Sequence, residues 1–318
     1  MKPSCHQLAA DIVELRKLQA ELNAWSVDDS DFYQVEKIYQ EIENRLLKVR
    51  EQISISPEQA EMILGQDYLG PKAIQETFGF VPENIPPIPF AKARIERAKE
   101  LGQFLVLRVN QTPDGELLNM KTIAALVPRQ DASGQTLFAN LYLRQDEAYY
   151  AEAPTLGWAL ATKELVPGSI SKNYLEQTEA LIDYLKTKIF VNQPLPEKYQ
   201  KAIEEFESQK STIRELAVSF DLSRKQQTKA TEMLESLAIV QLVRHSPIEA
   251  LYDILVYYKH NNVRLLEHVA SLTRRRAPRG EMVGVGRFDA EYGMNVIHTG
   301  PGWSLTSIND GAVYSETR

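Results

Sequence analysis

The chain has 318 residues, one cysteine and a formal net charge of −7, which favours two domains and disfavours a general nucleic-acid-binding protein. Because Cys5 is alone, no internal disulfide can form. No apolar run approaches membrane-spanning length, and the first residues lack the continuous apolar core of a signal peptide. We therefore expect a cytoplasmic protein without a membrane span, although export by a non-standard route leaves no such mark.

The first part of the chain has helical periodicity. Apolar residues recur at three- and four-residue spacing from about Gln7 to Ser54, and the segment from Trp25 to Ser30 interrupts them with residues suited to capping a helix. The pattern predicts two helices, and the short connection predicts an antiparallel hairpin. Such a hairpin is either a packed cap, which we prefer, or an element that joins copies of the chain into a homo-oligomer.

A proline-rich segment follows two short helices, which are expected to start near Ser56 and after Gly70. From Val81 to Pro89, each proline removes a backbone donor and restricts its neighbour, which excludes a helix or a central strand. We place a stiff linker at Ile85–Pro89. The predicted division is a helical hairpin and linker region at 1–89 and a second domain at 90–318.

Mixed strands and helices follow the linker. Strands are predicted at 104–109, 137–143 and 158–161, and helices at 92–101, 173–190, 197–218, 224–242 and 248–259. The segment Thr273–Arg279 holds four arginines, a cluster that can bind phosphate or nucleic acid. In an acidic protein, a solvated charged loop is the preferred interpretation.

The last stretch, Gly280 to Arg318, differs from the rest of the chain. Short apolar alternations are separated by Gly, Pro, Asn, Asp and Ser, which predicts strands joined by turns. Aromatic, amide, hydroxyl and arginine side chains on such loops are typical of adaptable binding surfaces. The alternative is a surface β-meander whose loops have no function.

Recognisable catalytic patterns are missing from the sequence. The five histidines have no metal-ligand spacing. We also find no phosphate-binding glycine motif and no nucleophile elbow. The sequence therefore predicts no catalytic residue, metal ligand or cofactor. The alternative is a hydrolytic enzyme that uses His298 with Asp289 or Asp310.

Several segments resemble a known family. The segments 265–273, 279–283 and 311–315 resemble the end of a C-type-lectin-like domain of the formylglycine-generating-enzyme-like branch. Upstream, 157–160, 172–178 and 247–251 resemble the strand and two helices that precede that end. This branch includes the variable proteins of diversity-generating retroelements. The resemblance covers about 101–318, with a helical insertion at about 197–242.

This resemblance implies an α+β fold and a non-catalytic protein that presents a diversifiable loop surface, at about 284–315, to an unknown protein or other macromolecular ligand. The region lacks the active-site cysteines of the enzyme branch and the Glu-Pro-Asn or Gln-Pro-Asp set of calcium lectins. A structural or assembly protein that uses the N-terminal helices is a further alternative. The predicted ligand-binding residues are Arg287, Tyr292, Asn295, Ile297, His298, Thr299, Trp303, Ser304, Thr306, Ser307, Asn309 and Asp310.

Two classes of residue are expected within this stretch. The binding residues from Tyr292 onward are expected to point outward and to tolerate replacement. The scaffold is expected to be held by buried apolar side chains and by turn glycines with positive φ, namely Val283, Val285, Phe288, Val296, Val313, Gly293 and Gly311.

Overall fold

The computed structural model describes residues 55–138, 148–191, 194–218 and 224–300 of an α+β protein. By contact density, these residues form two compact units, one with 55–60 and 87–95 and a larger one with 61–86 and the described residues from 96 to 300. The predicted helical hairpin, the expected strand near residue 313 and the binding residues from Trp303 to Asp310 lie outside the described residues.

In the smaller unit, Ile55 N donates a backbone hydrogen bond to Phe90 O over 3.2 Å, which joins its two described segments. Helix α3 (Pro57–Leu64) begins in this unit, with proline at its first position as predicted. The hydroxyl of Ser56 accepts a 3.2 Å hydrogen bond from Gln59 N, which satisfies one free donor of the first turn. The predicted absence of helix and strand from 81 to 89 is confirmed.

The first sheet has the strand order β1 (Tyr68–Leu69), β2 (Gln103–Arg108) and β3 (Gly157–Thr162). Strand β1 is parallel to β2, and β2 is antiparallel to β3. Every residue of β2 is buried, as expected for a strand covered on both faces. Since β1 precedes the proline-rich segment, residues assigned from the sequence to the N-terminal region contribute a strand to the larger unit.

The second sheet is an antiparallel meander of β4 (Ala270–Arg276), β5 (Met282–Asp289) and β6 (Gly293–Thr299). The strands expected at the start of the C-terminal stretch are confirmed. The arginine-rich segment was wrongly interpreted as a solvated loop, because three of its arginines lie on β4.

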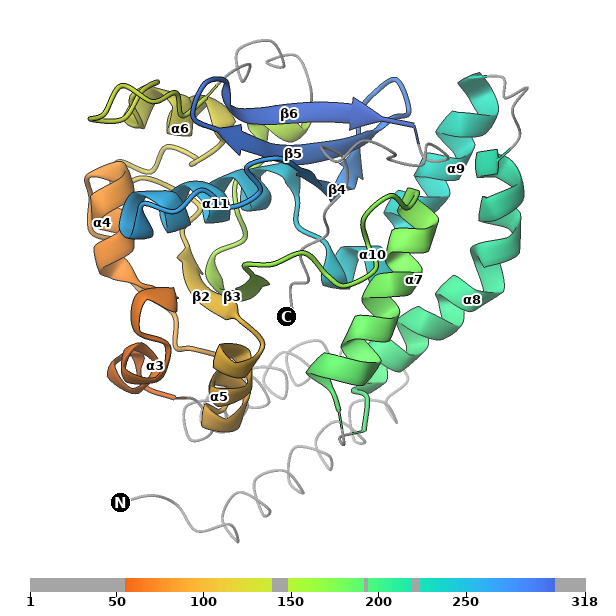
Figure 1. The fold of residues 1–318 in the computed structure, drawn as a ribbon, viewed down its shortest axis with the longest axis horizontal. Helices are drawn as coiled ribbons and strands as arrows, with labels where there is room; N and C mark the ends of the chain where they lie inside the picture. The colour runs from red at the N-terminus through yellow and green to blue at the C-terminus, as the bar shows by residue number, and fades with distance from the viewer. Residues whose placement is uncertain (1–54, 139–147, 192–193, 219–223, 301–318) are drawn as a thin grey trace, which may run out of the picture. The chain divides into compact units, whose positions relative to one another are not determined.

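Helix α11 (Pro247–Asn261) lies between the two sheets and contacts β1, β2, β4 and β5 (Figure 1). Every residue from 247 to 258 is buried, which is the environment that a predominantly apolar helix requires. A reciprocal capping box between Ser246 and Glu249 starts the helix. The helix ends at Asn262, which has a left-handed φ of 53°.

The described residues also form further helices. They are α4 (Pro71–Phe78), α5 (Lys92–Glu100), α6 (Met120–Leu126), α7 (Tyr174–Tyr184), α8 (Glu197–Val218), α9 (Arg224–Ser236) and α10 (Ala238–Val243), with a π-helix, η5 (Leu185–Ile189), after α7 and short 3-10 turns η2 (Gly65–Asp67) and η4 (Ala148–Ala151). The helix predicted at 224–242 is two helices, because Leu237 is extended. Helices α7 to α10 share one hydrophobic core with Leu272 and Met282 of the second sheet.

Candidate binding pocket at the end of β2

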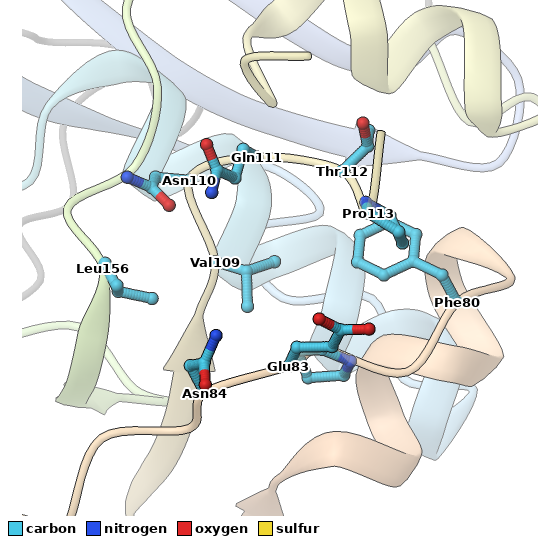
Figure 2. Close-up of a pocket in the computed structure, with 10 residues that line it drawn as sticks. Phe80, Glu83, Asn84, Val109, Asn110, Gln111, Thr112, Pro113 and Leu156 are labelled. Carbon is cyan, nitrogen blue, oxygen red and sulfur yellow. The ribbon is translucent and has the colours of Figure 1, made fainter. Parts of the chain in front are cut away.

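A cavity of about 260 Å³ opens where β2 ends and β3 begins. Three segments that are distant in the sequence line it (Figure 2). The lining residues are Phe80, Pro82, Glu83, Asn84, Val109, Asn110, Gln111, Thr112, Pro113 and Leu156. In the view of Figure 2, Val109 lies between the pair Glu83 and Asn84 and the pair Asn110 and Gln111.

The lining combines apolar surface with groups that form hydrogen bonds. The side-chain amides of Asn84, Asn110 and Gln111 and the hydroxyl of Thr112 both donate and accept, whereas the carboxylate of Glu83 only accepts. No lysine or arginine is among the residues that line this cavity. The arrangement therefore suits a neutral ligand whose own groups both donate and accept, and it disfavours an anion.

Backbone hydrogen bonds hold the loop after β2. Leu118 N donates to Asn110 O over 2.9 Å, and Thr112 N donates to Glu116 O over 2.8 Å. Across the cavity, Asn84 has a left-handed φ of 52°, a conformation that Asn tolerates better than most residues. The segment that carries Asn84 is tied to β3, because Trp158 Nε1 donates to Pro86 O over 2.8 Å.

A buried ion-pair network lies next to the pocket. The Nε and Nη2 atoms of Arg108, the last residue of β2, donate to the two carboxylate oxygens of Asp253 on α11 over 2.9 and 2.5 Å. The Nη1 atom of Arg108 lies 3.5 Å from Glu249 Oε1. This two-point geometry is the strongest arrangement that arginine makes with a carboxylate.

The network continues to the segment that precedes β3 and flanks the pocket, and to β4. Glu249 Oε1 accepts a 2.9 Å hydrogen bond from the hydroxyl of Thr155, and Glu249 Oε2 lies 2.9 Å from Arg274 Nη2 on β4. His245 Nε2 lies 3.2 Å from Asp253 Oδ2. Because Arg108 and Thr155 directly precede the lining residues Val109 and Leu156, the network fixes both segments relative to α11.

The network has a predicted acid sensitivity. Burial acts to raise the pKa of Asp253, but the charge and hydrogen bonds of Arg108, with a smaller contribution from His245, bring that pKa below its usual value. A lowered folded-state pKa stabilises the fold above the unfolded pKa of about 3.9, and this contribution is lost as pH falls through the folded pKa.

We expect the stability difference between the natural protein and the Asp253→Asn variant to be constant near neutral pH and to shrink below about pH 4. Urea unfolding at a series of pH values measures it. A difference that stays the same down to pH 3 would contradict the assignment.

The predicted C-terminal binding residues do not form one surface among the described residues. Tyr292 is 60% exposed in the turn between β5 and β6, whereas Arg287, Asn295, Ile297 and His298 are half-buried. Thr299 was expected to point outward, which is wrong because it is 6% exposed. Since neighbouring residues of a strand point to opposite faces, Ile297 and His298 do not share a face of β6.

The expected scaffold residues that lie in the described part of the chain are placed as predicted, whereas Val313 and Gly311 lie outside it. Val283, Val285 and Phe288 are fully buried, and Val296 is 1% exposed. Gly293 has a positive φ of 71°.

The alternative catalytic pair of His298 and Asp289 is not supported. His298 is opposite Val283 on β5, whereas Asp289 is opposite Gly293. Six residues of strand separate these positions, or about 20 Å. His298 Nε2 instead lies 3.0 Å from the hydroxyl of Tyr149, and Asp289 Oδ1 accepts hydrogen bonds from the backbone of the turn. Asp310 lies outside the described residues.

The arginines of β4 form ion pairs within the protein. Arg275 Nε lies 2.9 Å from Glu152 Oε1, and Arg276 Nε lies 3.1 Å from Glu235 Oε2. Burial raises the pKa of Glu152, and the charge of Arg275 opposes this shift. With the contact of Arg274 to Glu249, these ion pairs give each of the three arginines of β4 an acidic partner within the protein, whereas Arg279 is exposed in the turn after β4.

A sequence signal for the buried network existed and was missed. Glu249 and Asp253 are four residues apart in an otherwise apolar helix, so both lie on one face. Buried acids require a partner, and Arg108, at the end of an apolar strand, carries the opposite charge. The pocket itself has no comparable signal, because its three segments are distant in the sequence.

Comparisons with family models, with curated proteins and with solved structures found no match to this chain. The described helices include none that is long and apolar enough to span a membrane. In the described part of the chain, no three His, Cys, Asp or Glu residues are grouped so that they would hold a metal ion. The class defined by the fold is α+β.

Proposed function

We propose that this protein is a non-catalytic binding protein whose pocket at the end of β2 takes a small neutral polyhydroxyl ligand, of the size of a monosaccharide. Pockets for drug-sized ligands hold about 300–1,000 Å³, and the 260 Å³ of this cavity suits a smaller molecule. Hydroxyl groups both donate and accept, which matches the amides and the hydroxyl of the lining.

The lining of the pocket is the observation that carries this proposal. Three side-chain amides, a carboxylate and a hydroxyl surround the cavity, together with Phe80, Pro82, Pro113 and Leu156. Apolar surface with a few placed polar groups is typical of small-molecule sites. The adjacent network of Arg108, Glu249 and Asp253 supports the proposal, since a site held in place before binding loses less entropy on binding.

Saturation-transfer NMR with glucose, galactose, mannose and N-acetylglucosamine tests this function. We expect at least one of these sugars to bind and to be recovered unchanged. Removing one hydrogen-bonding side chain by Asn84→Gly or Gln111→Ala is expected to weaken binding about threefold to tenfold. Glycine is chosen at residue 84 because it accepts the positive φ.

The control is Gln130→Ala, which removes an exposed amide outside the pocket and is expected to leave binding unchanged. Failure of all four sugars to bind, or equal binding by the two pocket variants and the natural protein, would exclude this function.

The C-terminal stretch supports a second candidate function, a diversifiable binding surface on a C-type-lectin-like domain. The favourable observation is that Val285 and Val296 are buried while Tyr292 is 60% exposed, which separates scaffold from surface. A saturation library across Gly284 to Ser315, sorted for folding and then for binding, tests it. Equal intolerance at Tyr292 and Val285 would exclude a diversifiable surface.

A further inference from the structure

A second cavity, of about 440 Å³, lies at the opposite end of the β2–β3 strand pair from the pocket of Figure 2. Gly102, just before β2, and Thr162, the last residue of β3, both line it. Its volume is within the range of small-molecule sites. The lining also includes Lys99, Tyr184 and Lys188.

The hydroxyl of Thr162 lacks a hydrogen-bond partner within the described part of the chain, although the residue is only 3% exposed. Most buried polar side chains have a partner, and one without a partner needs an explanation. Because Thr162 lines the cavity, a ligand that contacts this hydroxyl supplies the missing hydrogen bond.

The part of the cavity wall that contains Lys188 is a π-helix, a rare backbone conformation. Lys188 belongs to the π-helix η5, where Phe190 N donates to Leu185 O over 2.8 Å. The guanidinium of Arg97 donates to Lys188 O from Nε over 3.3 Å and from Nη2 over 2.9 Å. π-Helical turns are uncommon and frequently occur at functional sites.

The charges around the cavity favour an anion. Two acidic residues line the cavity, and the carboxylate of Glu100 is neutralised by Arg97, which lies 2.7 Å away. The remaining negative charge, on Glu164, is outnumbered by the two positive charges of Lys99 and Lys188. A phosphate monoester carries a charge of about −1.5 to −2 at pH 7 and several strong acceptor oxygens. Lysine binds phosphate as a point charge. We propose that this cavity is a binding site for a small organic phosphate monoester, held by Lys99, Lys188 and the hydroxyl of Thr162.

Isothermal titration of the full-length protein with glycerol 3-phosphate tests the site, with glycerol as the uncharged control. We expect saturable binding of glycerol 3-phosphate and none of glycerol. The variants Lys188→Gln and Thr162→Val are expected to weaken binding about tenfold and about fivefold. Lys121→Gln on α6, an exposed lysine outside the cavity, is the matched control and is expected to leave the Kd within about twofold.

A thermal melt of Thr162→Val separates a binding role from a structural one. Valine has nearly the same shape and lacks the hydroxyl, so the ligand-free variant is expected to melt at the same temperature as the natural protein or higher. Malate, a dicarboxylate titrated in the same way, tests whether the site prefers a phosphate to other anions. Absence of saturable glycerol 3-phosphate binding, equal affinities in all variants, a lower melting temperature of ligand-free Thr162→Val, or malate binding as tightly as glycerol 3-phosphate would overturn the proposal.

Discussion

Replacing Arg108 by methionine is expected to lower the free energy of unfolding by about 3–5 kcal/mol. Arg108, Glu249 and Asp253 are buried, and the substitution leaves the Asp253 carboxylate without its two-point partner. Glu249 keeps Arg274 and Thr155, so most of the loss is expected to come from Asp253. Urea unfolding at pH 7 measures the change.

The double variant Arg108→Met/Asp253→Leu is the control for this prediction. Replacing both members of a buried ion pair by apolar residues of similar volume is often neutral or stabilising. We expect the double variant to recover most of the stability that the single variant loses. A single variant within about 1 kcal/mol of the natural protein, or a double variant no more stable than the single one, would show that the pair does not act as described.

Replacing Gly293 by alanine is expected to destabilise the fold by about 2–5 kcal/mol. Gly293 has a φ of 71°, which costs any residue with a Cβ atom. A Cβ atom at this position would also lie 2.7 Å from the backbone C of Leu137 and from the backbone N of Phe138, neither of which can move as a side chain does. Thermal and urea unfolding measure the loss.

Gly134→Ala is the matched control for the steric part of this effect. Gly134 has a φ of 82°, but a Cβ atom there would have no neighbour within 4 Å. Its replacement is therefore expected to cost only the backbone contribution of about 1–2 kcal/mol. Equal losses in the two variants would mean that the approach of residues 137 and 138 to β6 does not contribute.

Periodicity and turn chemistry were sufficient to predict most of the elements in the described residues. Helix α11 was expected from its apolar spacing and from Pro247, and β5 and β6 were expected from short apolar runs between glycines. These signals succeed because the burial of each element and its end signals are local in the sequence.

Strand β4 was not predicted because the residues that pair with its arginines are distant in the sequence. Three consecutive arginines argue for a solvated segment in the isolated sequence. On β4 they become compatible with a packed strand because Glu249, Glu152 and Glu235 neutralise them. Glu249 is on α11, Glu235 is on α9 and Glu152 follows η4, so no local sequence pattern predicts the pairing.

The pocket at the end of β2 could not be predicted from local sequence patterns either. The ligand-binding residues were predicted in the C-terminal stretch because its composition is typical of binding loops. The pocket of Figure 2 is formed instead by Phe80 to Asn84, Val109 to Pro113 and Leu156, which only the folded sheet brings together. The scaffold role of Val285 and Val296 was predictable because burial follows the two-residue period of a strand.

Chemical-shift mapping of backbone amides during titration with the sugar that binds tests the central claim most directly, because it locates the ligand on the molecule. We predict that the largest saturable changes occur at Glu83 and Asn84 and from Val109 to Thr112, and that Tyr292, Asn295 and His298 stay within the scatter of remote residues. Changes concentrated between Arg287 and Thr299, or no saturable change near the end of β2, would contradict the account.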